Sequence, residues 1–591
     1  MRMKNVKIAI LLSLIITASV ALVSTNVEYC TGALNKFTSY SALRQFLQND
    51  YGSENNPLMS GMRSLESSRS FDDYSRTNVQ VEGVDEADIV KTDGEYIYAK
   101  SGQSVIIVKA CPAEEAAVLS RMTVNGTLWQ MFVNRNRLVV FYQTCSQRGL
   151  QSYYEVKTSI AVFDVADKRE PTLVREAAVD GDFFSARMIG DYVYTVVTKY
   201  AGIIEDKVML PRVLGGNEWS TVDATEVYYV DMPNSHSIHL FATILALNVQ
   251  DDLQEPAYQT ILVESMTTIY VSMQNLYLAS GSLGKTFLHR IRFDNGEISY
   301  AGNGEVKGSL LNQFSMDEYE GYFRAVTTSY TETPQDSWRQ LNLESNLYVL
   351  DMSLTIIGTI EHIAPGEQVH SVRFMGDIGY IVTFRKVDPF FAVDLSNPYS
   401  PRMLGELKIT GYSDYLHIYD ESHVIGVGKE TVAAEEGDFS WYQGLKISVF
   451  DVTDIREPKE LAKHVIGDRG TYSPVLDDHK AFLFDKEKKL LAMPVSVAEV
   501  NKSMFPNGAS PYTYGDVVWQ GAYVFAVSLE SEEILELRGR ITHVDDGDLW
   551  NTSKQITRAL YIGDVLYTVS ESMIKMNALT DLSEIGELRL N

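Results

Sequence analysis

The sequence predicts an all-β protein, a β-propeller of four-stranded blades preceded by one short helix. Tyrosine (34) and phenylalanine (23) are abundant, cysteine is scarce (3), and long helical patterns are few. A strand–turn–strand pattern recurs along the chain about every 50–60 residues. A small sheet of this kind does not bury both of its faces alone, whereas a ring of such sheets does and leaves only short edges.

The repeated unit contains four strands. Its first two are joined by a Gly-Asp turn, as in SARMIGDYVYTVVT (185–198), SVRFMGDIGYIVTF (371–384) and TRALYIGDVLYTVS (557–570). A third strand ends in Asp, as in IAVFDV (160–165) and ISVFDV (447–452). A turn that contains Pro comes next, and a fourth strand follows it. The turn residues therefore stand where a four-stranded unit requires them.

Nine candidate units begin near residues 88, 129, 184, 266, 312, 369, 415, 474 and 556. The fifth and eighth are irregular, so the prediction is seven to nine blades. The segment TNVQV (77–81) is expected to add an outer strand to the last blade and so close the ring. Two stacked β-sandwiches are the alternative fold, but they do not require so regular a four-strand pattern.

Residues 1–30 are predicted to be a signal peptide or an N-terminal anchor. The basic segment MRMKNVK precedes a 16-residue apolar run, and Ser19 and Ala21 are small residues placed for cleavage after Ala21. The run is short for a spanning helix, although an uncleaved anchor attached to the membrane is the alternative. Glu28 and Tyr29 before Cys30 do not match a lipidation motif. We therefore expect a secreted or cell-surface protein.

Residues 31–75 are predicted to hold a short amphipathic helix and a flexible linker, and residues 76–591 the propeller. Leu43, Phe46 and Leu47 have helical spacing, with Ser39 or Ser41 as the N-cap. Residues 52–75 are rich in Ser, Asn and Gly and lack periodicity, which is typical of a linker.

The net charge of −27 and the pI of about 4.8 disfavour binding to nucleic acid, because such a surface repels phosphate backbones. An acidic surface favours solubility, divalent cations or cationic ligands.

The segment TNVQVEGVDEADIVKTDGEYIY (77–98) resembles the start of the propeller in a family of secreted prokaryotic proteins, many of them archaeal. Their C-terminal β-propeller is distantly related to WD40 repeats. The segment GDRGTYSPVLDDHKAFLFDKEKKLLAMPV (467–495) resembles a second block of that family, and the likeness spans roughly 34–591. The resemblance implies an exported propeller protein and supplies no catalytic residue.

The long insertions fall between the second and third strands of their units. They cover residues 199–237, 330–344, 431–444 and 500–517. In a propeller these connections open on one face, together with the links between successive blades. Elaborated loops on a rigid scaffold are where binding usually resides, so we expect the binding surface on this face.

The candidate binding residues on this face are aromatic or acidic. They are Trp219, Tyr228, Trp338, Trp441, Tyr512, Asp85, Glu86, Asp88 and Asp182. Aromatic side chains with polar tips suit sugar rings or peptides, and converging carboxylates suit calcium, for which Asp85 and Asp88 are the candidate ligands. Alternatively, the aromatic residues pack the long loops together and the acids accept hydrogen bonds from turn N–H groups.

Arg469, Asp478 and His479 are predicted to form a structural network. Asp-His near Ser473 suggests a hydrolase, but adjacent residues on a strand point to opposite faces, so they do not form an orienting pair. Export also makes a disulfide between Cys111 and Cys145 a candidate.

These features together predict a binding or interaction module at the cell envelope rather than an enzyme. Its partner would be a peptide, a glycan or an envelope protein, held through the loop-rich acidic face. The alternative is an envelope hydrolase or lyase that uses carboxylates at the propeller mouth.

The targeting segment gives the first testable prediction. Mass spectrometry of the protein purified from its native cells should find a mature N-terminus at Leu22, because Ser19 and Ala21 fit the signal-peptidase site. Peptides from residues 1–21 in the purified protein would contradict cleavage and indicate an N-terminal anchor.

Overall fold

A computed structural model describes residues 34–50, 73–148, 153–216, 218–230, 239–282, 284–335, 338–384, 388–435, 439–506, 508–545 and 547–590. The predicted targeting segment (1–30) and most of the predicted linker (52–75) lie outside these residues. The described part contains nine sheets of at least four strands, each with a four-strand antiparallel core. The core strands follow one another in the chain except in the third sheet, where an insertion separates β12 from β18. The predicted β-propeller of four-stranded blades is therefore confirmed, and all nine candidate units correspond to sheets.

The first three sheets include the two largest. The first contains β3 (Val90–Thr92), β4 (Tyr96–Ser101), β5 (Ser104–Lys109) and β6 (Ala117–Thr123). The second contains β7 (Thr127–Asn134), β8 (Arg137–Arg148), β9 (Tyr153–Asp164) and β10 (Thr172–Asp180), extended by β15 (Arg212–Gly215) and β16 (Glu218–Thr221). The third contains β11 (Asp182–Ile189), β12 (Tyr192–Tyr200), β18 (Leu240–Asn248) and β19 (Ala257–Val263), extended by β2 (Asp85–Glu86), β17 (Val227–Val230) and β1 (Leu34–Lys36).

The next three sheets are simpler. The fourth contains β20 (Met266–Val271), β21 (Asn275–Ser282), β22 (Lys285–Asp294) and β23 (Glu297–Lys307). The fifth contains β24 (Ser309–Leu310), β25 (Met316–Tyr319), β26 (Tyr322–Gln335), β27 (Trp338–Leu350) and β28 (Ile356–Ile363). The sixth contains β29 (Gln368–Met375), β30 (Ile378–Phe384), β31 (Asp388–Asp394) and β32 (Arg402–Ile409).

The last three sheets complete the ring. The seventh contains β33 (Tyr412–Asp420), β34 (His423–Ala433), β35 (Ser440–Asp451) and β36 (Lys459–Ile466). The eighth contains β37 (Leu483–Asp485), β38 (Leu490–Glu499), β39 (Asp516–Val527) and β40 (Leu535–Ile541). The ninth contains β41 (Arg558–Ile562), β42 (Val565–Val569), β43 (Met573–Ala578) and β44 (Glu584–Arg589).

Short 3₁₀ helices occur in the connections. They are η1 (Ala113–Glu115), η2 (Ala224–Glu226), η3 (Gln313–Ser315), η4 (Pro474–Leu476), η5 (His479–Ala481), η6 (Lys502–Met504) and η7 (Thr552–Lys554). Two of them, η4 and η5, precede the eighth sheet and explain why its first strand is only three residues long. The irregularity predicted for the eighth unit is thus a pair of helical turns in place of a full inner strand.

The predicted Gly-Asp turns join the first and second strands of several sheets. Gly190, Gly376 and Gly563 have φ values of 56°, 55° and 56°, which fall in the left-handed region. Glycine adopts this conformation without a steric penalty, and short hairpin turns require it.

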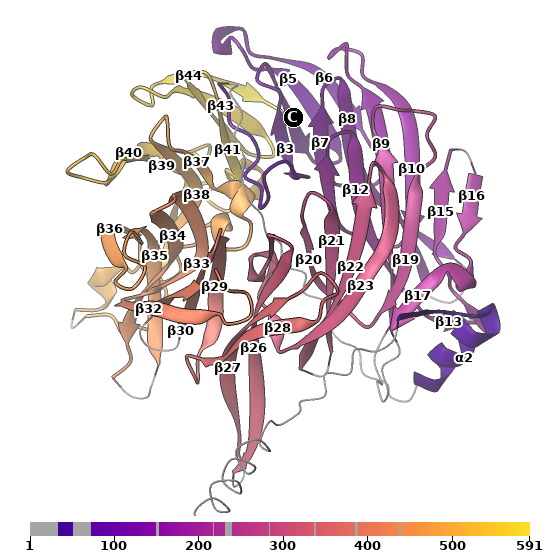
Figure 1. The fold of residues 1–591 in the computed structure, drawn as a ribbon. Coiled ribbons are helices and arrows are strands. Elements are labelled where there is room, and N and C mark those ends of the chain that lie inside the picture. The colour runs from indigo at the N-terminus through magenta and orange to yellow at the C-terminus, as the bar shows by residue number, and fades with distance from the viewer. Residues whose placement is uncertain are drawn as a thin grey trace, which may run out of the picture. The chain divides into compact units, whose positions relative to one another are not determined.

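Hydrophobic side chains fill the interface between each pair of neighbouring sheets. Nine buried clusters account for nine interfaces among the described residues. The last cluster joins Ile97 and Ile106 of the first sheet to Tyr567 and Ile574 of the ninth, so the ring closes. Figure 1 shows this closure, with the first strands in purple beside the last strands in yellow.

Residues 73–88, called here the crossing segment, do not form the predicted outer strand of the last blade. The ninth sheet has its own outer strand, β44, which occupies the position predicted for residues 77–81. The crossing segment instead lies across the hub. The hub is the centre of the ring, where the inner strands of the sheets, which are the first strands of their four-strand cores, meet. It begins on the ninth sheet, where the Ser75 backbone N–H donates to the Tyr561 carbonyl at 2.9 Å.

From there the crossing segment contacts sheets all around the hub. Asn78 Nδ2 donates to the Tyr415 hydroxyl of the seventh sheet at 3.1 Å and to the carbonyl of His479, before the eighth, at 3.0 Å. Gln80 Nε2 donates to the Gln313 carbonyl, before the fifth sheet, at 3.1 Å. β2 then pairs with β11 of the third sheet, and Asp88 bridges to β7 of the second.

The predicted N-terminal helix is present as α2 (Tyr40–Asp50). Ser39 Oγ accepts a hydrogen bond from the Ala42 N–H at 3.1 Å, so Ser39 acts as its N-cap. Leu43 and Leu47 are fully buried in the cluster between the second and third sheets. The helix therefore belongs to the folded body.

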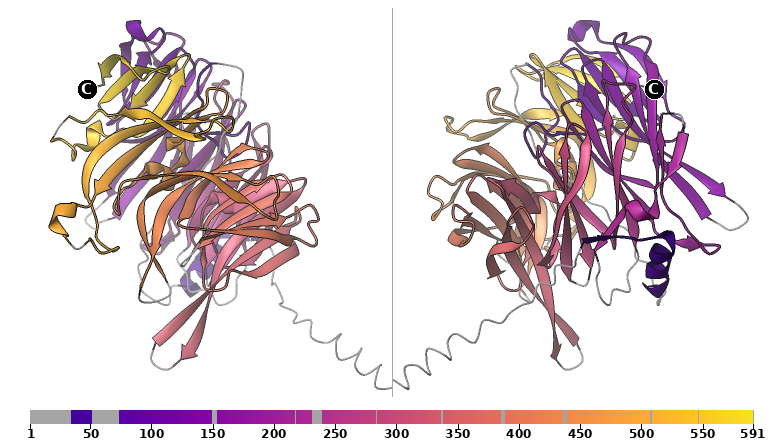
Figure 2. Two further views of the ribbon diagram at one scale, coloured as in Figure 1. Left: turned by 90° about the vertical axis from the view of Figure 1, so that its left-hand side faces the viewer. Right: turned by 45° about the vertical axis from the view of Figure 1, so that its right-hand side comes forward.

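The long insertions lie between the second and third core strands of their sheets, as the sequence predicts. The insertion expected at 330–344 is not a loop but the end of the long hairpin β26–β27, which projects from the body in Figure 2. The insertion of the third sheet contains a two-stranded sheet, β13 (Ile203–Ile204) and β14 (Lys207–Val208), before the edge strands β15–β17.

The candidate disulfide is wrong, since Cys111 and Cys145 are both free and exposed. Cys111 follows β5 in the first sheet, whereas Cys145 lies near the far end of β8 in the second. Because strand direction alternates, these positions lie at opposite ends of the strands. No helix within the described residues has the length and apolar character needed to span a membrane.

A buried ion pair reinforces ring closure. Arg558 of β41 binds Asp88 at the end of the crossing segment through Nε at 3.1 Å and Nη2 at 2.9 Å. Its Nη2 also reaches Asp478 at 2.5 Å. Burial alone would lower the pKa of Arg558, but the Asp478 and Asp88 carboxylates raise it above its ordinary value.

Replacing Arg558 should destabilise the closed ring. We expect Arg558→Met to lower the free energy of unfolding by about 3–5 kcal/mol, because it leaves two carboxylates buried without a cation. Urea unfolding of the full chain measures this. Arg456→Met, which removes an exposed arginine paired with Asp454, is the control and should leave the free energy unchanged within error. Equal effects of both substitutions would contradict the role of Arg558 in closure.

Candidate functional site

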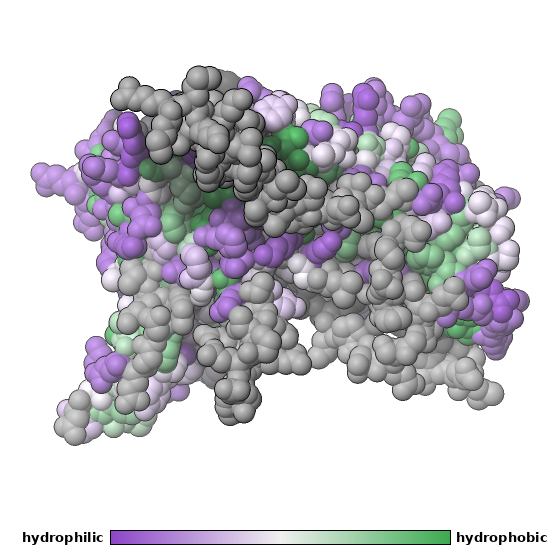
Figure 3. All heavy atoms as spheres, turned by 60° about the horizontal axis from the view of Figure 1, so that its bottom comes forward, coloured by the Kyte–Doolittle hydropathy of each residue, from purple (hydrophilic) through white to green (hydrophobic). Residues whose placement is uncertain are grey.

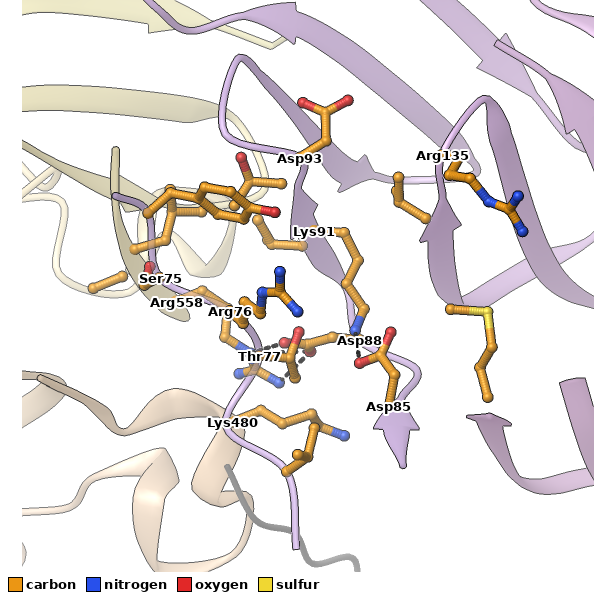
Figure 4. A pocket seen from close by; sticks show the side chains of 18 of the residues that line it. Ser75, Arg76, Thr77, Asp85, Asp88, Lys91, Asp93, Arg135, Lys480 and Arg558 are labelled. Atoms are coloured by element: carbon orange, nitrogen blue, oxygen red, sulfur yellow. Dashed lines mark hydrogen bonds and ion pairs between the residues drawn. The ribbon is translucent and has the colours of Figure 1, made fainter. Parts of the chain in front are cut away.

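A pocket of about 530 Å³ opens at the hub beside the crossing segment. Its border includes Asp93, Arg135 and Gly190, which stand in the turns between the first two strands of the first, second and third sheets. The crossing segment and the first strand of the ninth sheet, β41, complete the wall. Lys91, Asp85, Asp88 and Arg558 converge in Figure 4, whereas Asp93 and Arg135 lie apart from them. The pocket therefore lies at the end of the strands opposite the long insertions.

Lys91 of β3 extends into the pocket toward the crossing segment (Figure 4). Its Nζ donates to Asp85 Oδ1 at 2.7 Å and to the Glu86 carbonyl at 2.6 Å. The side chain is buried, and its Nζ lies 5.4 Å from the centre of the Phe132 ring. Lys91 and Asp85 thus neutralise one another inside the pocket.

Lys480 and Arg558 form the other side of the pocket floor. Arg558 is held by Asp88 and Asp478, as described above. Lys480 Nζ has longer contacts, at 3.3 Å from the Ala87 carbonyl and 3.6 Å from Asp478 Oδ1. Its burial lowers the pKa of the ammonium below the ordinary value, although Asp478 and Asp88 oppose the shift.

Glu86 lies next to the pocket and faces the third sheet. Its Oε2 is 3.1 Å from Arg187 Nη2, and its Oε1 accepts from the Gln80 N–H at 3.2 Å. Burial raises the pKa of Glu86 to about 7, while Arg187 and Lys480 oppose the shift. Arg187 Nη2 also donates to Gln313 Oε1 at 2.7 Å, which links the third and fifth sheets across the hub.

The predicted acidic residues separate into two locations. Asp85, Glu86 and Asp88 meet at the hub, but each contacts a cation. Asp182 lies at the start of β11 and accepts from Gln143 Nε2 at 2.7 Å. The described residues contain no group of three or more His, Cys, Asp or Glu side chains arranged for a metal ion. Asp85 and Asp88 already bind Lys91 and Arg558, so their surroundings do not fit the predicted calcium ion.

Two of the predicted aromatic residues come together on the face that carries the long insertions. The Trp441 and Tyr512 rings are 5.7 Å apart at 62°, and Phe439 packs on Trp441 at 4.9 Å. The Tyr442 and Tyr514 hydroxyls share a hydrogen bond. We call the group Phe439, Trp441, Tyr442, Arg469, Tyr512 and Tyr514 the aromatic cluster.

The remaining predicted aromatic residues lie elsewhere. Trp219 is on β16, where the Arg212 guanidinium sits 5.2 Å from its ring. Tyr228 of β17 stacks on Tyr300 with ring centres 5.1 Å apart. Trp338 begins β27, and its side chain falls outside the described residues.

Arg469 belongs to the aromatic cluster and not to the hub. Its guanidinium lies 3.9 Å from the Tyr442 ring centre and 4.5 Å from that of Tyr514, and it donates to the Tyr442 carbonyl at 3.2 Å. Asp478 and His479 do lie at the hub, where His479 Nε2 is 3.1 Å from the Asn78 carbonyl. The three residues predicted as one network therefore serve two separate regions.

Sequence reasoning missed the cationic side of the hub pocket. Its basic residues come from positions 76 to 558, so no local motif contains them. One residue could have pointed to this pocket from the sequence. Lys480 directly follows Asp478 and His479 within residues 467–495, the second segment that resembles the family.

Comparisons with known proteins agree with this fold. A family model described as "Beta propeller domain" matches residues 74–582. An uncharacterized protein of Methanocaldococcus jannaschii is 27% identical over 89% of this chain and 85% of its own length. An uncharacterized protein of Archaeoglobus fulgidus is 26% identical over 88% of this chain and 85% of its own.

Glu86 gives a testable pH dependence. Its pKa is about 7 in the folded state against an ordinary value of 4.5. Between these values the folded protein retains a proton that the unfolded chain has lost, so stability falls as pH rises. The free energy of unfolding falls by on the order of 3 kcal/mol across that pH range.

The difference in the free energy of unfolding between wild type and Glu86→Gln isolates the effect of Glu86 protonation, because glutamine does not titrate. We expect the wild-type free energy of unfolding to fall relative to that of Glu86→Gln from about pH 5 to about pH 7.5. Glu115→Gln, at an exposed position, is the control and should follow wild type over this range. Parallel curves for wild type and Glu86→Gln would contradict the raised pKa.

Proposed function

Because this chain belongs to the beta propeller domain family, we propose that it is an exported binding module of the cell envelope that holds a protein partner through the aromatic cluster. The family and the fold support binding in general. The proposed location rests on the sequence of residues 1–30. The proposed partner rests on the structure of the face that carries the long insertions.

The observation that carries the proposal is a set of aromatic side chains that are held together by packing and hydrogen bonds and are partly exposed. Tyr512 is 62% exposed and Tyr514 58%, and both stand on the insertion of the eighth sheet. Gln443 of the seventh sheet donates through Nε2 to the Pro511 carbonyl at 2.9 Å, and the Tyr442–Tyr514 hydrogen bond joins the same two insertions. Side chains fixed before binding lose little conformational entropy when a partner arrives.

The composition and geometry of the cluster favour a protein over a glycan. Tryptophan, tyrosine and arginine are the residues that most often dominate protein–protein binding energy. The ring pairs Phe439–Trp441, Trp441–Tyr512 and Tyr442–Tyr514 meet at 81°, 62° and 77°. Rings at such angles enclose an apolar corner rather than a flat platform, which suits an inserted side chain better than a stacked sugar.

Export is supported by the basic and apolar segments within residues 1–30. The acidic balance of the chain suits a soluble surface outside the cell. Hydrophilic side chains cover most of the described surface on the face drawn in Figure 3, with smaller hydrophobic groups between them.

The alternative of a hydrolase or lyase receives less support from the hub. Such enzymes need carboxyl groups that are free to exchange protons with a substrate. Asp85 and Asp88 are instead paired with Lys91 and Arg558. The geometry therefore favours binding over acid–base catalysis.

The test uses binding of the purified full chain to envelope fragments from the cells that produce it. We expect Tyr512→Ala to weaken binding at least about tenfold, because it removes a central exposed ring. Tyr399→Ala is the matched control, since Tyr399 is 66% exposed between β31 and β32, at the opposite end of the strands.

Protease treatment of the fragments should abolish binding, and periodate oxidation of their sugars should not. Equal binding by Tyr512→Ala and wild type would contradict the aromatic cluster as the contact surface. Loss of binding after periodate alone would contradict a protein partner.

A further inference from the structure

We propose that the hub pocket binds a small organic anion, a molecule with one carboxylate or phosphate group on an apolar body. This site is independent of the aromatic cluster and lies at the other end of the strands. The inference rests on the charge, the contacts and the shape of the pocket.

The charge balance of the pocket is opposite to that of the chain. The chain has 78 acidic and 51 basic residues. The pocket wall has five basic residues, Arg76, Lys91, Arg135, Lys480 and Arg558, and three acidic ones, Asp85, Asp88 and Asp93. Two further carboxylates outside the wall also contact these cations: Asp191 pairs with Arg135, and Asp478 pairs with Arg558. A recess whose wall holds more basic than acidic residues, in an acidic protein, is a favourable place for an anion.

The pairing inside the pocket identifies Lys480 as the anchoring group. Asp85 forms an ion pair with Lys91 at 2.7 Å, and Asp88 forms one with Arg558 at 2.9 Å. Among the described residues, the contacts of Lys480 Nζ are longer, at 3.3 Å to the Ala87 carbonyl and 3.6 Å to Asp478 Oδ1. A bound carboxylate or phosphate would accept a short charge-assisted hydrogen bond from this ammonium, which is stronger than either contact.

The position of Lys480 increases the value of that bond. Its side chain is buried, so water screens the interaction poorly. Arg76 lies exposed at the rim, and Thr77 stands next to it on the crossing segment (Figure 4). These groups add a second cation and a hydroxyl to the pocket wall.

The size of the pocket and the apolar residues in its wall indicate what the uncharged part of the ligand would be. A volume of about 530 Å³ lies within the usual range for small-molecule pockets. Val79, Val133, Met188 and Leu560 contribute apolar surface to the wall. An anion with an apolar body therefore fits better than inorganic phosphate, which would leave this surface wet.

Binding should also stabilise the ring. The pocket wall combines the first three sheets, the ninth sheet, Lys480 and the crossing segment, which are the parts that meet at ring closure. A ligand that contacts them together binds the folded state and not the unfolded chain, so it raises the melting temperature. Melting thus provides a readout beside direct calorimetry.

The experiment compares three probes with the purified full chain: phenyl phosphate, inorganic phosphate and benzyl alcohol. Calorimetry and melting are both measured against sodium chloride of equal ionic strength. We expect phenyl phosphate to bind and raise the melting temperature, inorganic phosphate to bind more weakly, and benzyl alcohol to do neither. Absence of any effect from phenyl phosphate, or an equal effect from benzyl alcohol, would overturn the proposal.

Lys480→Met should weaken phenyl phosphate binding at least about tenfold, because it removes the charged donor. Lys489→Met is the matched control, since that lysine pairs with an exposed glutamate and does not line the pocket. Arg76→Gln, at the exposed rim, tests the site without altering the floor and should also weaken binding. Unchanged binding in both pocket variants would overturn the assignment, even if binding itself occurs.

Discussion

Closure of the ring is the constraint on which the rest of the structure depends. Each of the nine sheets completes its own four core strands, so no strand is shared between the first and ninth sheets. Their joint depends on apolar packing such as that of Ile97 against Tyr567, and on the buried Asp88–Arg558 ion pair. Burying these charges is tolerated because Arg558 is held by two carboxylates with good geometry.

The same constraint shapes the hub. The crossing segment passes the inner sides of the ninth, seventh, fifth, third and second sheets before it enters the first. Its polar groups are buried there and need partners, which Tyr415, Gln313 and Arg187 provide. The centre of the ring is therefore a pocket with a charged floor, in which Lys480 has the weakest ionic contacts.

The molecule thus presents two different surfaces at the two ends of its strands. The tight turns between first and second strands surround the hub pocket, which is narrow, charged and lined by buried groups. The long connections between second and third strands carry the aromatic cluster, in which Tyr512 and Tyr514 are exposed and the rings are held by mutual packing and hydrogen bonds. A small anion suits the first surface and a protein side chain suits the second, so the two proposed activities do not compete for the same residues.

The sequence alone determined the repeat, because alternating apolar residues and Gly-Asp turns act over neighbouring positions. The turns at Gly190, Gly376 and Gly563 and the helix with Leu43 and Leu47 were predictable for this reason. The tertiary structure decided which distant residues meet. Residues 77–81 form no outer strand, Asp88 binds Arg558 at a separation of 470 positions, and Arg469 separates from Asp478. These outcomes depend on ring closure, which brings residues hundreds of positions apart into contact and leaves no local pattern in the chain.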